Sequence, residues 1–114
     1  HRVTDKYGGR VFAIKKINKH KIKQQNMLGQ IWTEISIMYQ INHRNIVRMF
    51  DHFESEHHLC LVMEYVEKGS LLQLLAKSKH LSELRTKAIL KDIISAVEYL
   101  HKRTPPIIHR DIKP

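Results

Sequence analysis

The sequence has little cysteine, proline or glycine and lacks a long apolar run. Its 114 residues include one cysteine, three prolines and four glycines. The single cysteine, Cys60, excludes an internal disulfide, and its place in the apolar run 59–63 predicts a buried, inert thiol. No apolar stretch approaches the roughly 18 residues of a membrane span, and residues 1–10 lack the apolar segment of a signal peptide. We therefore expect a reducing, intracellular compartment, cytoplasmic or nuclear, and no membrane partner.

Acidic residues are scarce in the first 30 positions, where Asp5 is the one acid against eight lysines and arginines. The whole chain has a net charge of +9, with 42% hydrophobic and 27% charged residues, which is ordinary for a globular protein. A basic stretch of this kind can bind nucleic acid or acidic lipid. It lacks interleaved aromatics and a recognised binding motif, so we expect a solvated surface and no nucleic-acid partner. A basic nucleic-acid-binding domain is the alternative, and it predicts salt-dependent retention on DNA or RNA.

Residues 1–65 have the pattern of strands with one helix. Gly8 and Gly9 indicate a turn between two short strands. Three apolar runs predict strands over residues 11–17, 46–50 and 59–65. Between the first two runs, apolar residues recur at the spacing of one helix face and predict a helix over 25–40: Leu28, Ile31, Trp32, Ile35 and Met38.

Residues 71–114 have the pattern of helices. Ser70 is a suitable cap for a helix over 71–76, and Ser82 for a helix over 83–102 that ends before Thr104-Pro105-Pro106. The longer helix has an apolar stripe: Leu90, Ile93, Ile94, Val97 and Leu100. The change of pattern at residues 66–70 predicts a boundary, and the whole order predicts an α+β fold.

Lys15 is the first candidate for chemistry. It lies inside an otherwise apolar strand, where an unpaired ammonium is costly to bury. Glu34 precedes Ile35 of the helical apolar face by one position, so it can face the strand and pair with Lys15. A lysine held in this way can bind phosphate. A purely structural salt bridge, or a lysine whose stem covers apolar surface, is the alternative.

The last eight residues, IIHRDIKP, contain the second candidate. Asp111 precedes Lys113 by two residues in a loop. Such a pair suits phosphoryl transfer, because the carboxylate can orient a hydroxyl and accept its proton while the lysine neutralises the transferring phosphate. An ordinary loop ion pair is the alternative. His57 and His58 lack the carboxylate-or-cysteine cluster of a metal site, so we predict no metal ligand in this chain.

Five segments in this order resemble the eukaryotic protein kinases over essentially the whole chain. Residues 11–15, Val-Phe-Ala-Ile-Lys, resemble the V-A-I-K strand with one residue inserted, and Glu34 matches the helix glutamate that pairs with its lysine. Residues 43–47 are similar to the H-x-N-I-V turn and strand that follow that helix, and residues 61–66 to the hinge. Residues 99–101 and IIHRDIKP resemble the end of a helix running into the catalytic loop.

The resemblance implies a role for each candidate. Lys15, locked by Glu34, would hold the α- and β-phosphates of ATP, and Ala13 would cap the adenine ring. Met63 would be the gatekeeper, and Glu64 and Val66 would offer backbone groups to adenine.

In the terminal loop the resemblance makes Asp111 the acceptor of the substrate hydroxyl and Lys113 the partner of the γ-phosphate. It also matches Met38 and Met49 to a regulatory hydrophobic spine and His109 to its base, which are packing roles. The implied cofactors are ATP and Mg²⁺, and the implied partner is a protein with serine or threonine acceptors, since Lys113 favours that class over tyrosine kinases.

Residues 1–65 would form part of the N-lobe, 66–70 the hinge and linker, and 71–114 the start of the C-lobe. Residues 68–71 and 83–86, with Phe53, look similar to Aurora kinases and their polo-like and calcium-dependent neighbours. Ser70 stands where some kinases have an acid, which puts an arginine-directed preference in doubt.

The family's Gly-rich loop would precede His1, and the magnesium-binding Asn and Asp-Phe-Gly would follow Pro114. We therefore expect a segment truncated at both ends, inactive alone, with helices unburied on one side. The alternative is a non-catalytic truncated kinase or pseudokinase that acts as an interaction module, against which the intact Lys15, Glu34 and Asp111 argue. The sequence makes no prediction of oligomeric state.

Overall fold

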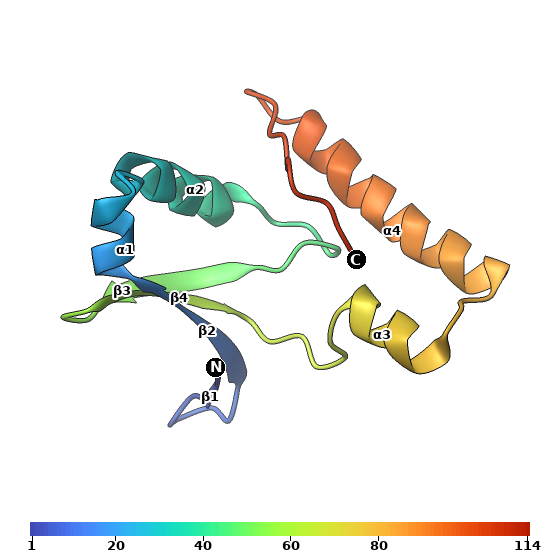
Figure 1. Ribbon diagram of the computed structural model, residues 1–114, viewed down its shortest axis with the longest axis horizontal. Coiled ribbons are helices and arrows are strands. Elements are labelled where there is room, and N and C mark those ends of the chain that lie inside the picture. The colour runs from blue at the N-terminus through green and yellow to red at the C-terminus, as the bar shows by residue number, and fades with distance from the viewer. The chain divides into compact units, whose positions relative to one another are not determined.

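The computed structural model describes residues 1–114, and their contacts divide the chain into two units. The first unit comprises residues 1–42 and 47–66, and the second comprises residues 43–46 and 67–114. The first contains four strands and two helices (Figure 1): β1 (Arg2–Thr4), β2 (Val11–Asn18), α1 (Lys19–Gln24), α2 (Leu28–Gln40), β3 (Met49–Glu54) and β4 (His58–Glu64). The second contains α3 (Leu71–Ser78) and α4 (Glu83–His101). These elements confirm the α+β class.

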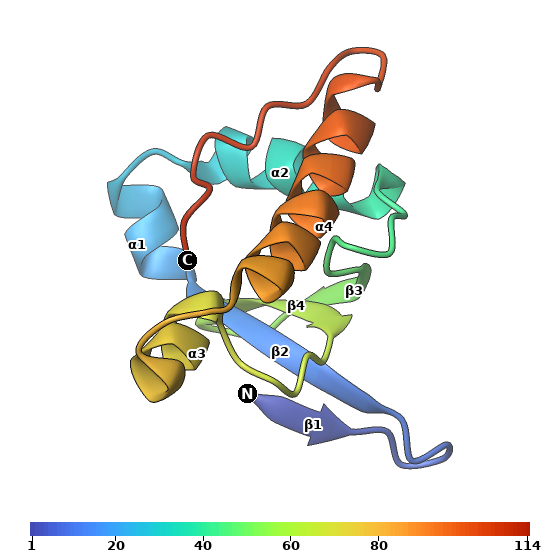
Figure 2. The ribbon, with the colours of Figure 1, turned by 90° about the vertical axis from the view of Figure 1, so that its right-hand side faces the viewer.

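The four strands form one antiparallel sheet in the order β1-β2-β4-β3. The predicted turn at Gly8 and Gly9 joins β1 to β2, which lie side by side (Figure 2). Gly9 has a φ of 65°, a left-handed conformation that glycine adopts without the steric cost of a Cβ. Gly9 therefore favours the turn of the hairpin that begins the sheet.

The core of the first unit lies between α2 and one face of the sheet (Figure 1). Ile31 and Ile35 on α2 are buried against Leu59 and Leu61 of β4. The spacing of the two isoleucines by four residues puts them on one side of the helix, as the sequence predicted. Cys60 is also buried and unpaired, which confirms the predicted burial of the thiol.

Two segments differ from the prediction. The helix predicted over 25–40 begins at Leu28, and a separate helix, α1, precedes it. The Asn18 side chain caps α1 by accepting hydrogen bonds from the backbone N–H groups of His20 and Lys21. Asn26, with a φ of 52°, separates the two helices. Because α1 buries only Ile22, it has no apolar periodicity that a pattern search would detect.

The strand predicted over 46–50 is Met49–Glu54 in the structure. The Ile46 N–H donates to the His43 carbonyl in a turn, and residues 46–48 lie outside the strand. The strand then continues through charged residues to Glu54, with an irregularity between Met49 and Asp51. An exposed edge strand needs little apolar surface, which is why hydrophobicity placed it too early.

The caps of the second unit are as predicted. The Ser70 side chain accepts from the Gln73 N–H, and the Gln73 side chain accepts from the Ser70 N–H, which makes a reciprocal capping box. Ser82 caps α4 by accepting from the Arg85 N–H. α3 continues two residues beyond the predicted end, to Ser78, and Lys79 then adopts a φ of 58°.

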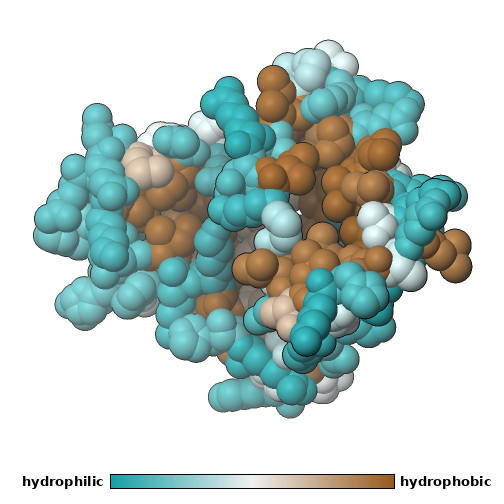
Figure 3. Space-filling model, turned by 45° about the vertical axis from the view of Figure 1, so that its right-hand side comes forward, coloured by the Kyte–Doolittle hydropathy of each residue, from teal (hydrophilic) through white to brown (hydrophobic).

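Helix α4 buries only part of its apolar stripe. Leu100 is buried, whereas Leu90 and Ile94 are 50% and 64% exposed. Apolar side chains reach the surface on the side of the molecule seen in Figure 3. This confirms the prediction that the helices are unburied on one side. None of the helices combines the length and the hydropathy needed to cross a bilayer.

Residues 43–46 pack within the second unit. The His43 ring stacks at a tilt on Tyr99, with 5.0 Å between centroids. Its Nδ1 accepts from the Asn45 N–H at 3.1 Å, which leaves Nε2 protonated to donate to Ser95 Oγ at 3.3 Å. His43 thus fixes this short loop on α4, and the histidine of the H-x-N-I-V segment has a clear structural role.

Candidate functional site

Three of the predicted nucleotide-binding residues lie on one face of the sheet. Ala13 pairs with Met63, and Lys15 pairs with Leu61, across the β2–β4 ladder. Directly paired residues point to the same face, and residues two apart along a strand do so as well. Leu61 belongs to the core that α2 covers, so Ala13, Lys15 and Met63 share the α2 side of the sheet. On this face the Lys15 ammonium can bind a phosphate, and the small side chain of Ala13 leaves room for a flat ring.

The predicted ion pair between Lys15 and Glu34 is not formed. Both residues are exposed, and the five ion pairs of the structure do not include them. The pair was expected because an ammonium inside an apolar strand needs a partner. The Lys15 side chain reaches water instead, so the desolvation cost that would demand a partner does not arise.

The hinge residues follow at the end of β4. The Glu64 N–H donates to the Arg48 carbonyl at 2.8 Å, and the Arg48 N–H donates to Glu64 Oε2 at 3.1 Å. Val66 lies beyond the strand, is 54% exposed, and makes no backbone hydrogen bond. Its N–H and carbonyl are therefore free to bind a ligand edge.

The terminal loop brings Asp111 and Lys113 together. Lys113 Nζ donates to Asp111 Oδ2 at 2.8 Å, and both side chains are about 70% exposed. The Asp111 N–H donates to His109 Nδ1, and Arg110 has a φ of 66°. The hydrogen bond from Lys113, and then its charge, lower the pKa of Asp111 below its usual range.

Replacing Lys113 with alanine is expected to raise the pKa of Asp111, because the depressed value comes mainly from that lysine. In the unsubstituted chain the Asp111 carboxylate stays ionised to a lower pH than in Lys113→Ala. Any stability that the Asp111–Lys113 pair contributes is therefore lost only as the pH falls through the lowered pKa of Asp111. Carboxyl-carbon NMR across an acid titration measures the shift. Lys87→Ala, which removes the partner of Glu83, is the matched control. An unmoved Asp111 midpoint in Lys113→Ala means that the pair does not form in solution.

The packing residues of the predicted spine behave differently from one another. Met49 is 4% exposed, and Met38 packs against the same core, which confirms a packing role for both. His109 is exposed in the terminal loop.

A group of three rings was not predicted from the sequence: His52 of β3 contacts Trp32 and Tyr39 of α2. Two aromatics seven residues apart on one helix were the available signal, because such residues lie on one helix face.

Comparison with known proteins identifies the family. The protein kinase domain family matches residues 1–114, which is the whole chain. The chain therefore belongs to the protein kinase domain family, and the four-stranded sheet with its helices is part of that fold.

The relatives are protein kinases. The chain is 39% identical over 112 residues to the human NUAK family SNF1-like kinase 1, which covers 98% of this chain and 17% of the relative. It is 34% identical over 110 residues to an Aurora kinase of Schizosaccharomyces pombe, covering 96% of this chain and 30% of the relative. It is 38% identical over 106 residues to CBL-interacting protein kinase 11 of Oryza sativa subsp. japonica, covering 93% of this chain and 21% of the relative. The chain thus spans less than a third of the length of each of these relatives.

Proposed function

We propose that the chain is the ATP-binding and catalytic-loop part of a serine/threonine protein kinase, which transfers the γ-phosphate of ATP to protein hydroxyls. The observation that carries this proposal is the shared face of Ala13, Lys15 and Met63, on a chain that matches the kinase family throughout. Residues 1–65 serve as N-lobe, 66–70 as hinge and linker, and 71–114 as the start of the C-lobe.

The residues of the sheet bind the nucleotide. The exposed Lys15 ammonium holds the α- and β-phosphates, and Ala13 leaves room for the adenine ring. Met63 packs behind the ring against the core, and the free backbone of Val66 with the Glu64 carbonyl meets its polar edge. Glu34 acts by pairing with Lys15 in the active arrangement.

The terminal loop binds the acceptor. Asp111, kept ionised by Lys113, orients the substrate hydroxyl and accepts its proton, and Lys113 then steadies the γ-phosphate. Mg²⁺, when bound, neutralises phosphate charge in the family, and we propose no ligand for it among these 114 residues. Lys113 after the aspartate supports serine/threonine specificity. The buried free thiol of Cys60 supports an intracellular compartment.

We further propose that the 114 residues alone are inactive. They contain no Asp-Phe-Gly, so the family's main magnesium carboxylate is not among them. The test is an assay of γ-phosphate transfer to peptides with serine, threonine or tyrosine acceptors. It compares the 114-residue chain with a protein that carries it inside a complete kinase domain.

We expect transfer to serine and threonine by the complete domain and none by the chain. Preferential labelling of tyrosine would refute the specificity. Nucleotide binding without any transfer by the complete domain would favour the pseudokinase alternative.

A further inference from the structure

A pocket with a polar lining lies where the end of β2 and helix α1 meet the turn between β3 and β4. Its volume is about 360 Å³, and six residues line it: Asn18, Lys19, His20, Lys23, Glu56 and His57. All six belong to the first unit. We name this hollow the α1 pocket. None of its lining residues is a candidate for binding the nucleotide or the acceptor, so the α1 pocket is a different site from the proposed kinase centre.

Backbone and ion-pair contacts hold the walls of the α1 pocket together. The Lys19 N–H donates to the His57 carbonyl at 3.0 Å, which ties the first residue of α1 to the β3–β4 turn. The Lys19 ammonium lies 2.6 Å from Glu54 Oε2. The N–H groups of the next two residues of α1 donate to the Asn18 side chain. Because these three backbone donors already have partners, a ligand must be recognised by the lining side chains.

The cationic groups of α1 exceed the carboxylates that neutralise them. The helix has the sequence Lys-His-Lys-Ile-Lys-Gln, with no acidic residue. Lys19 has Glu54 as its partner, whereas the ion pairs of the structure do not include Lys23 or His20. Glu56, the one carboxylate of the lining, lies 3.8 Å from His57 Nε2. The α1 pocket therefore offers an uncompensated ammonium and two imidazoles to an anion.

The lining side chains determine the chemistry of that anion. A lysine ammonium binds phosphate as a point charge, and imidazole N–H groups donate hydrogen bonds to its oxygens. The volume of the pocket lies near the lower end of the roughly 300–1,000 Å³ that is typical of small-molecule sites. This volume leaves room for a small organic group beside the phosphate, as in a phosphate monoester.

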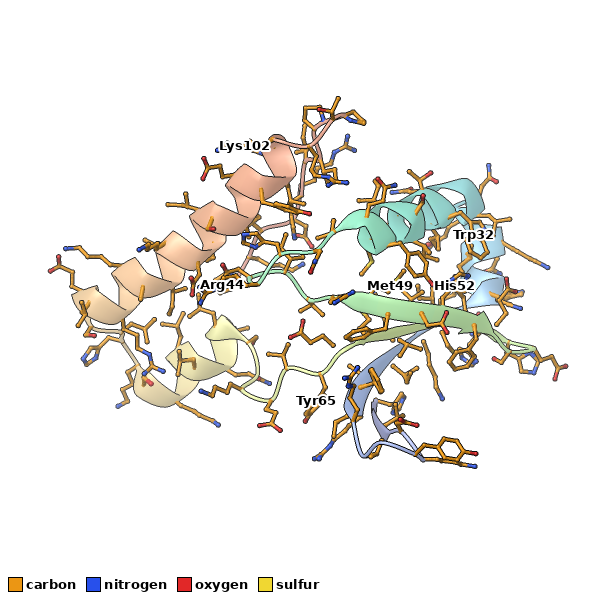
Figure 4. All side chains as sticks on the ribbon, turned by 180° about the vertical axis from the view of Figure 1, so that it is seen from behind. Trp32, Arg44, Met49, His52, Tyr65 and Lys102 are labelled. Carbon is orange, nitrogen blue, oxygen red and sulfur yellow. The ribbon has the colours of Figure 1, made fainter.

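The lining also disfavours other phosphate-bearing ligands. It contains no apolar side chain to bind a lipid chain and no Phe, Tyr or Trp on which a nucleobase could stack. Trp32 and His52, which meet between α2 and β3 (Figure 4), are not among the lining residues. A compact and hydrophilic phosphate fits the pocket best.

We propose that the α1 pocket binds a soluble phosphate monoester, and that Lys23, His20 and His57 hold its phosphate group. Glu56 opposes this binding, because its charge has the same sign as that of the ligand. The inference also gives a use to the basic stretch of residues 1–30, whose excess of positive charge the proposed kinase function does not employ.

The first test is an amide NMR titration of the 114-residue chain with glycerol 2-phosphate and, separately, with inorganic phosphate. Sodium chloride keeps the ionic strength constant, so that general screening does not change. We expect saturable shifts in residues 18–23 and 56–57. Residues 77–80, Lys-Ser-Lys-His, are the internal control, because they are basic and exposed but are not part of the α1 pocket. Equal shifts in both regions mean non-specific attraction and overturn the proposal.

The second test compares three variants in the same titration. Lys23→Gln is expected to weaken binding roughly 1.5- to fivefold, the range of exposed ion pairs. Glu56→Gln is expected to strengthen binding by a similar factor, because it removes a like charge. Lys77→Gln, which removes an exposed lysine of α3, is the matched control and should leave the affinity unchanged. The proposal fails if Lys23→Gln and Lys77→Gln have equal effects, or if Glu56→Gln weakens binding.

Two further ligands separate the possible sources of the phosphate group. One is a phosphoserine peptide in the same titration, and the other is a vesicle of phosphatidic acid in a sedimentation assay. Binding of the peptide or the vesicle, without saturable binding of either small phosphate, overturns the assignment of a soluble monoester. None of these readouts involves phosphate transfer, so a failed kinase assay leaves the inference standing, and an active kinase does not establish it.

Discussion

Replacing Asp111 with asparagine is expected to lower kcat by roughly 10²- to 10⁴-fold in a protein that carries this chain within a complete kinase domain. The amide keeps the size of the side chain and loses the basic oxygen that takes the hydroxyl proton. It also loses the charge that pairs with Lys113 at 2.8 Å. Because the change acts on the chemical step, KM for ATP should stay within a few-fold.

The measurement is initial-rate phosphorylation of a serine peptide at saturating ATP. Asp92→Asn is the matched control, since Asp92 is an exposed aspartate on α4 whose side chain makes no hydrogen bond or ion pair. A loss in the control as large as in Asp111→Asn would point to a folding defect. A complete kinase domain whose kcat is unaffected by Asp111→Asn would rule out Asp111 as the base.

Local signals in the sequence predicted much of the fold. Ser70 and Ser82 are the caps that their spacing indicated, because a cap needs only its own backbone and the next three residues. The Gly8-Gly9 hairpin is another local signal. Helix α1 was not predicted, because its one buried residue, Ile22, gives no repeated spacing of apolar residues. Its existence depends on the Asn18 cap and on burial of Ile22 against residues far away in the chain.

In the candidate site, too, one part could be predicted from the sequence and another could not. The alternation of side chains along a strand put Ala13 and Lys15 on one face, and the register with β4 added Met63. The distance between Lys15 and Glu34 depends on where α2 lies over the sheet. That position is set by packing of Ile31 and Ile35 on the sheet and by the ring contacts of Trp32 and Tyr39 with His52 of β3. A pairing across elements of this kind cannot be read from one-dimensional spacing.

Truncating Leu61 to alanine is expected to destabilise the first unit by about 2–5 kcal/mol. Leu61 is 3% exposed, and it packs with Ile31 and Ile35 at the centre of the core. Removing its branched end leaves a cavity that the sheet cannot close, because β2 and β3 flank it in fixed register. Since domains are typically stable by only about 5–15 kcal/mol, this loss takes a large share of the total.

Urea unfolding followed by Trp32 fluorescence measures the change, and the midpoint should fall with little change in slope. Leu28→Ala is the matched control, because it removes the same atoms from a side chain that is 52% exposed at the start of α2. Its cost should be near the roughly 0.5 kcal/mol of ordinary surface substitutions. Equal costs for the two variants would mean that Leu61 is not in the core.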